Sequence, residues 1–371
     1  MKKMIKLSLV AAVAVAGLST TASAGSLEEA IKGTSIKGQV TVGNETSAFK
    51  NAGVANVNQW EYDVDATFTT KVTDTITSTV GFQSDLDQSR TAGNSDAGVT
   101  NTKAYFTAKT SVATVMVGKQ KVGTPFLDDN RGNGIVALVP AGPVTIAAAY
   151  FNGFNGSDAG GAFDTADVMA LAALGKAGPV NFAAWYVDTS IATATNINVK
   201  GKFGPANVEV NHASAELDAA GSKAETLTKV IASMKMGEVT LTGAYAMTND
   251  KSGATARTHG VALASDQDAA ANFQGHVIEL DGLDGASAFL IGASTKVAGA
   301  SVGAHYVSAS SDKTTGSNVD ATELAANVSY ALAKSLSVNA YYAIYDAENA
   351  TTGVTANSSE TETQINISYK F

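Results

Sequence analysis

Apolar and polar residues alternate along most of this chain, and the pattern is clearest in residues 363–371. Ile365, Ile367, Tyr369 and Phe371 alternate there with polar residues. Because successive side chains of a strand point to opposite faces, this period of two predicts a two-faced strand. Similar segments recur from Ser35 onward and predict about 18 strands, at residues 35–44, 60–71, 75–84, 102–110, 113–120, 134–140, 143–151, 167–175, 179–188, 196–203, 206–215, 226–236, 238–248, 286–297, 300–309, 321–332, 335–346 and 361–371.

The connections between these segments alternate between short and long. The short ones contain Gly, often beside Pro, as in 140–144, 176–180 and 202–206, and are typical of tight hairpin turns. The long ones are rich in Asn, Asp, Ser, Thr and Gly, and include 188–194 and 248–285, of which the last can contain a further hairpin. Short turns at one end and long loops at the other are typical of an all-β, transmembrane antiparallel β-barrel of the outer membrane.

Alternation alone does not distinguish such a barrel from a soluble β-sandwich. The residues at the two ends of the chain favour the barrel. Residues 1–24 comprise a basic start, an apolar run from Leu7 to Leu18 and an Ala22-Ser23-Ala24 site, which is typical of a cleaved signal peptide. Residues 25–34 are expected to form a short periplasmic segment, with helix-type spacing over 27–32. Residues 35–371 are then a single barrel domain, in which an even number of strands leaves both ends on the periplasmic side.

The terminal aromatic residue Phe371 also favours a barrel, because the last strand must pair with the first to close the sheet. We expect Ile365, Ile367, Tyr369 and Phe371 to form this closing strand against Ile36–Val42, and to serve as the carboxyl-terminal assembly signal. An aromatic side chain at this position is also suited to the membrane interface.

Composition narrows the possible functions. The 371 residues contain no cysteine and carry a net charge of −9, which becomes −12 once Lys2, Lys3 and Lys6 are removed with the signal peptide. An acidic chain offers no basic surface for nucleic acid. A barrel of 16–18 strands encloses an aqueous channel, whereas about eight strands enclose only side chains.

One loop, at about 119–134, differs from the others in its chemistry. Charged residues surround the apolar sequence Pro125-Phe126-Leu127, which is expected to hold the loop inside the lumen. Charges at a narrow point determine selectivity, because low-dielectric walls focus their field. The predicted constriction comprises Lys119, Lys121, Thr124, Pro125, Asp128, Asp129 and Arg131.

Charged residues at lumen-facing positions of the predicted strands are candidates for the channel wall. Each is either a selective group or a solvated wall charge without such a role. The set comprises Lys37, Asp63, Asp65, Lys103, Lys109, Lys200, Lys202, Glu209, Lys229 and Lys235.

The segments Leu7–Ala12, Leu27–Lys32 and Gly118–Gln120, with Thr124-Pro125-Phe126 and Asp128-Asp129, resemble the Campylobacter-type major outer membrane porins of the epsilonproteobacteria. This resemblance implies an 18-stranded, homotrimeric porin in a lipopolysaccharide-containing outer membrane. It further implies a water-filled, cation-favouring pore for small hydrophilic solutes and ions. The Ala-rich central strands and the shorter length depart from that pattern.

No arrangement of residues indicates an enzyme or a cofactor. His212, His259, His276 and His305 are scattered and fall in no nucleophile or metal motif. A cation site is conceivable in loop 248–285, which holds two of these histidines with several aspartates, although a solvated surface loop is the plainer interpretation. Asp128 and Asp129 are weak candidates for a divalent cation. Alternative functions are an adhesin or structural barrel acting through its long loops, and a substrate-specific channel.

Overall fold

The computed structural model describes residues 32–50, 56–89, 98–126, 130–155, 167–249, 285–311, 320–348 and 358–371, with residues 270, 273, 275, 276, 278 and 280. The predicted signal peptide and most of the segment 25–34 lie outside these residues, as do Asp128, Asp129 and His259. Within the described residues, no helix has the length and apolar character needed to cross a bilayer.

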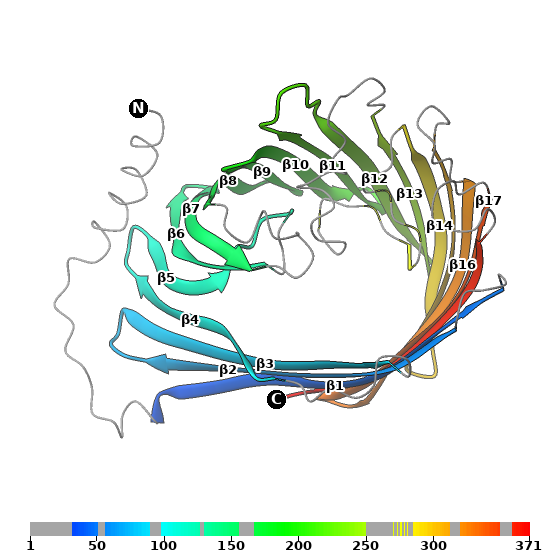
Figure 1. Ribbon diagram of the computed structural model, residues 1–371, viewed down its shortest axis with the longest axis horizontal. Helices are drawn as coiled ribbons and strands as arrows, with labels where there is room; N and C mark the ends of the chain where they lie inside the picture. Colours follow the sequence, from blue (N-terminus) through cyan, green and yellow to red (C-terminus); the bar gives the residue numbers. More distant parts are fainter. Residues whose placement is uncertain are drawn as a thin grey trace.

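A single sheet of 18 antiparallel strands closes on itself, as Figure 1 shows. Each strand pairs with the next in the chain, so the predicted count and the hairpin order are confirmed. The strands are β1 (Thr34–Phe49), β2 (Val57–Lys71), β3 (Ile76–Ser89), β4 (Thr100–Lys109), β5 (Thr114–Lys121), β6 (Arg131–Ala141), β7 (Val144–Asn155), β8 (Asp167–Ala177), β9 (Val180–Thr189), β10 (Ala192–Phe203), β11 (Ala206–Leu217), β12 (Glu225–Met236), β13 (Val239–Thr248), β14 (Ser287–Val297), β15 (Ala300–Ser310), β16 (Asp320–Ala333), β17 (Leu336–Glu348) and β18 (Ser358–Lys370).

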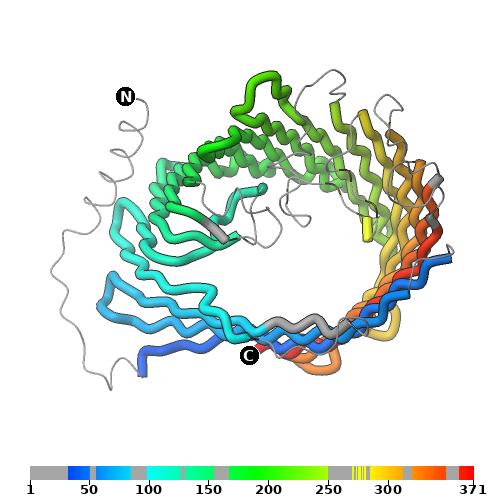
Figure 2. The backbone as a smooth tube through the Cα atoms, viewed as in Figure 1, coloured from blue at the N-terminus to red at the C-terminus, as the bar shows by residue number. Residues whose placement is uncertain are grey.

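The barrel closes where β18 pairs with β1, the partner that the sequence predicts. The paired residues run from Gln39 opposite Lys370 to Phe49 opposite Glu360, and Figure 2 shows the two ends of the colour scale side by side. Phe371 extends the ladder, because its N–H and C=O each form a 3.0 Å hydrogen bond with Gly38. A Cβ atom at Gly38 would collide with the Phe371 ring, so glycine gives the terminal aromatic its space.

The two faces of the wall have opposite chemistry. Large apolar side chains on the outer face are exposed, among them Ile36, Phe106 and Ile197, at 52%, 57% and 56%. Leu324 of β16 and Tyr342 of β17 are likewise exposed. Such exposure would be costly in water and is suited to lipid.

Two connections differ from expectation. The β9–β10 connection, predicted as a long loop at 188–194, is a tight turn, because the Thr189 hydroxyl accepts hydrogen bonds from the N–H groups of Ile191 and Ala192. The first loop, expected at 44–59, begins only after Phe49, since the polar residues of β1 remain in the ladder with β2 and β18. Polar side chains alone do not end a strand whose backbone groups still have hydrogen-bond partners in the neighbouring strands.

Candidate functional site

Part of the inner wall is covered by two segments that fold into the barrel. Alanine side chains on the inner faces of β7 and β8, including Ala149 and Ala170, are buried rather than exposed to the lumen. They belong to one apolar cluster with Phe126 from the β5–β6 connection and with Leu280 from the β13–β14 connection. The small residues of the central strands therefore provide room for inserted chain, which explains their composition.

The first inserted segment joins β5 to β6 and contains the Phe126 predicted as its anchor. Phe126 is fully buried, and Val122 and Thr124 are nearly so. The ends of the segment are brought together by a 2.8 Å hydrogen bond from the Val122 N–H to the Asn130 carbonyl. In Figure 2 the chain that follows β5 lies inside the ring of strands.

The charged residues predicted for this loop do not all lie in it. Lys119, Lys121 and Arg131 belong to β5 and β6, so the loop itself is shorter than the predicted range 119–134. The Lys119 ammonium donates to the Asn101 carbonyl at 2.6 Å. Arg131 donates to Gln83 Oε1 of β3 at 3.1 Å, which ties the start of β6 to a non-adjacent strand.

A second inserted segment, described at residues 273, 275, 276, 278 and 280, lies in the loop 248–285, which was interpreted from the sequence as a solvated surface loop. Phe273, Ile278 and Leu280 are buried in the same apolar cluster as Phe126. A hydrogen bond from the Gly275 N–H to the Ile278 carbonyl, at 2.7 Å, folds the segment into a narrow turn. This segment has apolar residues inside a long polar loop, which is the same signal that identified Phe126. That signal could therefore have predicted the second inserted segment from the sequence.

Glu323 of β16 holds this second segment. Its side chain is fully buried on the inner wall. One carboxylate oxygen accepts the His276 N–H at 2.8 Å and contacts His305 Nε2 at 2.8 Å, while the other accepts the Ile278 N–H at 2.9 Å. A buried carboxylate needs such donors, because burial without them costs several kcal/mol.

The His276 ring lies parallel to the Tyr341 ring, with the centroids 4.1 Å apart and an 8° angle between the planes. Burial against the wall, followed by repulsion from His305, lowers the pKa of His276 below its usual 6.5. The ring is therefore uncharged at neutral pH and stacks as a neutral aromatic.

Carboxylates gather on the inner wall where β1, β2 and β18 adjoin, beside the second segment. Tyr341 donates its hydroxyl to Glu362, and Glu45 interacts with both Glu362 and Glu61. Gln59 donates to Glu61 at 3.2 Å. We name the three residues Glu45, Glu61 and Glu362 the carboxylate strip. None of them was predicted from the sequence: Glu45 lies in the loop expected between the first two strands, whereas Glu61 and Glu362 lie inside predicted strands, on the polar side of the alternation, which could have identified them.

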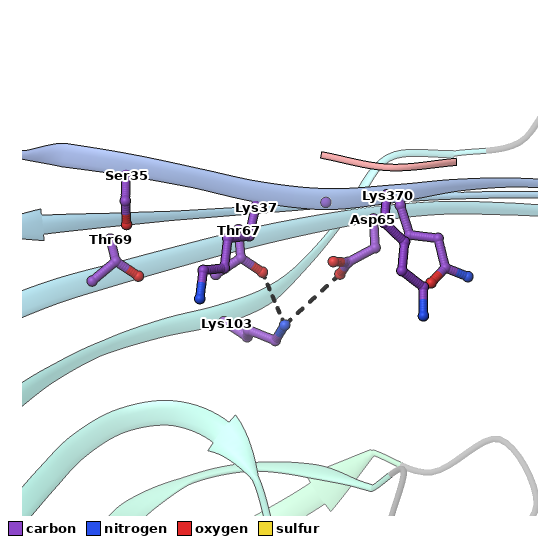
Figure 3. Close-up of a pocket in the computed structure, with 9 residues that line it drawn as sticks. Ser35, Lys37, Asp65, Thr67, Thr69, Lys103 and Lys370 are labelled. Atoms are coloured by element: carbon purple, nitrogen blue, oxygen red, sulfur yellow. Dashed lines mark hydrogen bonds and ion pairs between the residues drawn. The ribbon is translucent and has the colours of Figure 1, made fainter. Parts of the chain in front are cut away.

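A cavity on the same wall, near the end of the barrel that carries the short turns, has the opposite balance of charge (Figure 3). Lys37, Lys103 and Lys370 line it together with one carboxylate, Asp65. Lys103 donates to the Thr67 hydroxyl at 3.0 Å and lies 3.8 Å from Asp65. Three of the predicted wall residues are thus brought together here, while Lys370 was not among them.

The other predicted wall residues are distributed around the barrel. Glu209 accepts a hydrogen bond from Asn198 at 2.7 Å. Lys229 is buried and donates to the Ala270 carbonyl at 2.8 Å, beside the second segment. The cross-strand register places the rest on the inner-facing side of their strands, at Asp63, Lys109, Lys200, Lys202 and Lys235.

Among the described residues, no three His, Asp or Glu side chains converge as metal ligands. The described strands form a closed wall that is apolar on the outside, and its inner side carries charged residues together with the apolar cluster that holds two inserted segments. Residues 1–185, from the start of the chain into β9, match the family model described as Campylobacter major outer membrane protein. The chain is an outer-membrane porin of this family. The porin forms a channel through the outer membrane.

Solved structures show the same fold at low sequence identity. OccAB1 of Acinetobacter baumannii is 12% identical with a TM-score of 0.74, over 91% of the porin and 97% of that chain. A BenF-like porin from Pseudomonas fluorescens Pf-5 is 16% identical with a TM-score of 0.72, over 92% and 99%. OpdK of Pseudomonas aeruginosa, solved with vanillate, is 12% identical with a TM-score of 0.67, over 91% and 98%. No curated protein matches the sequence.

Proposed function

We propose that this porin is a cation-favouring diffusion channel for small hydrophilic solutes and ions. The carboxylate strip is the observation that carries the proposal. Three carboxyl side chains lie on the part of the inner wall formed by β1, β2 and β18, and Asp63 lies on the inner-facing side of β2. Acidic side chains that line a pore attract cations and repel anions. The net negative charge of the whole chain acts in the same direction.

Neutralising the strip tests this proposal. The variant Glu45→Gln/Glu61→Gln/Glu362→Gln should lose cation preference by roughly threefold or more, because a wall of one charge sign raises the local counter-ion concentration by about tenfold or more. The measurement is the reversal potential of single channels in a salt gradient.

A matched control removes three carboxylates from exposed connections between strands, as Asp74→Asn/Asp218→Asn/Glu238→Gln. Its overall charge equals that of the strip variant, and its reversal potential should stay at the wild-type value. Equal reversal potentials for the wild type, the strip variant and the control would show that the carboxylate strip does not determine ion selectivity. An anion-selective wild type would reject the proposal itself.

A second candidate is a channel specific for organic anions. The observation that favours it is the cavity with three lysines and one aspartate, which would suit a carboxylate-bearing solute. OpdK, which shares the fold, was solved with such a molecule, vanillate. Saturable block of the ionic current by a small carboxylate, lost on Lys37→Gln/Lys103→Gln, would favour this candidate over general diffusion.

We also propose that the porin assembles as a homotrimer, which is the assembly implied by its resemblance to the family. Multi-angle light scattering of the protein in detergent, with the detergent mass subtracted, would give three chain masses of 37.6 kDa less the signal peptide.

A further inference from the structure

The second inserted segment is anchored to the wall at two charged points. Lys229 of β12 donates to the Ala270 carbonyl, and Glu323 of β16 accepts the N–H groups of His276 and Ile278. Three strands lie between β12 and β16 in the sheet, so the two anchors hold different parts of the segment. The described residues that the anchors hold, Ala270, His276 and Ile278, lie on the inner side of the wall, so their position affects the cross-section left for permeation.

The Glu323 anchor is the more specific of the two. Both carboxylate oxygens are used, one by two donors and the other by one. Gly275 approaches so closely that an added Cβ atom would collide with the Glu323 carboxylate. The carboxylate cannot move aside cheaply, because it is fully buried and would give up its donors.

Apolar burial alone would not hold the segment in one position. Phe273, Ile278 and Leu280 belong to the apolar cluster of the inner wall, and apolar attraction is non-directional. Hydrogen bonds to fixed backbone N–H groups do fix a direction. We propose that Glu323 is a positioning residue for permeation, which holds the second inserted segment in the lumen at His276 and Ile278 and so sets the limiting cross-section of the channel.

The proposal predicts two conductance levels, one with the segment docked and a higher one with it undocked. Glu323→Gln replaces one acceptor oxygen with an NH₂ group that faces a backbone N–H. The loss of one such buried hydrogen bond shifts the docked-to-undocked ratio by about tenfold. Dwell times in single-channel recordings measure this ratio. The control Glu216→Gln, on an exposed position of β11, should give wild-type dwell times.

A second variant tests the same contact without changing a charge. Gly275→Ala should also populate the higher level, because its Cβ atom displaces the segment from Glu323. In a Glu323→Ala background the collision partner is gone, so Gly275→Ala should add nothing there. The control Gly243→Ala, where the nearest atom to the added Cβ lies 4.0 Å away, should behave as wild type.

Docking can also be followed directly, because the chain has no native cysteine. A Leu280→Cys thiol should resist a membrane-impermeant maleimide when Glu323 is present, and should react about tenfold faster with Glu323→Gln. The gel mobility of each variant before and after heating verifies that its barrel is folded. Unchanged dwell times for Glu323→Gln and Gly275→Ala, with equal labelling of Cys in both backgrounds, would overturn the proposal. The Glu323 proposal rests on the proposed channel function, but not on whether the channel favours cations or anions. Its failure would therefore leave the cation-favouring proposal unaffected.

Discussion

Replacing Phe126 with alanine should widen the channel more than any other single change considered. Phe126 is fully buried in the cluster that joins both inserted segments to the wall. Truncating a buried Phe costs about 3–5 kcal/mol. That loss falls on the docking of the β5–β6 connection, because the barrel itself is held by its hydrogen-bonded ladder. Single-channel conductance and the size limit for sugars in liposome swelling should both increase.

The control is Phe106→Ala on the outer face of β4, where the side chain is 57% exposed. It makes the same chemical change without touching the cluster, so conductance and size limit should remain at wild-type values. A Phe126→Ala channel with the wild-type sugar limit would show that the first segment does not narrow the pore.

The second large effect is expected at the end of the chain. Phe371→Asp should reduce the amount of folded barrel in the outer membrane about fivefold or more, because it places a charge on the lipid-facing side of the closing seam. It also removes the ring that stacks on Tyr369 and covers Gly38. The channels that do assemble should conduct normally, since the outer face does not line the pore. Heat-modifiable gel mobility of outer-membrane fractions measures the folded amount.

Phe203→Asp provides the matched control. Phe203 is an exposed aromatic at the end of β10, beside a short turn, and the change introduces the same charge at an interior hairpin. A loss confined to Phe371→Asp supports the terminal assembly signal. Equal losses in both variants would reduce the role of Phe371 to that of an ordinary interface residue.

The sequence predicts the barrel well because the alternation within each strand shows which of its residues share a face. Ile365, Ile367 and Tyr369 alternate with polar residues irrespective of what surrounds them, so strand count, order and closure follow from a local pattern. Loop insertion is different, because it depends on contacts between residues distant in sequence. The inner-face alanines of β7 and β8 show small side chains, but not which segment covers them.

The same distinction explains the charged residues. Lys37, Asp65 and Lys103 are predictable as wall residues because their strands have clear alternation, and they do share a cavity. Glu323 has the right parity, yet its function depends on His276, Ile278 and His305, which come from elsewhere in the chain. Pairing of this kind is tertiary information that a single sequence does not display.

A planar-bilayer recording of the wild-type protein in a salt gradient tests the central claim most directly. The account predicts stepwise insertion of conducting units and a reversal potential of cation-selective sign, since the carboxylate strip lines the wall beside the inserted segments. The absence of steps at any voltage, or a reversal potential of anion-selective sign, would contradict it.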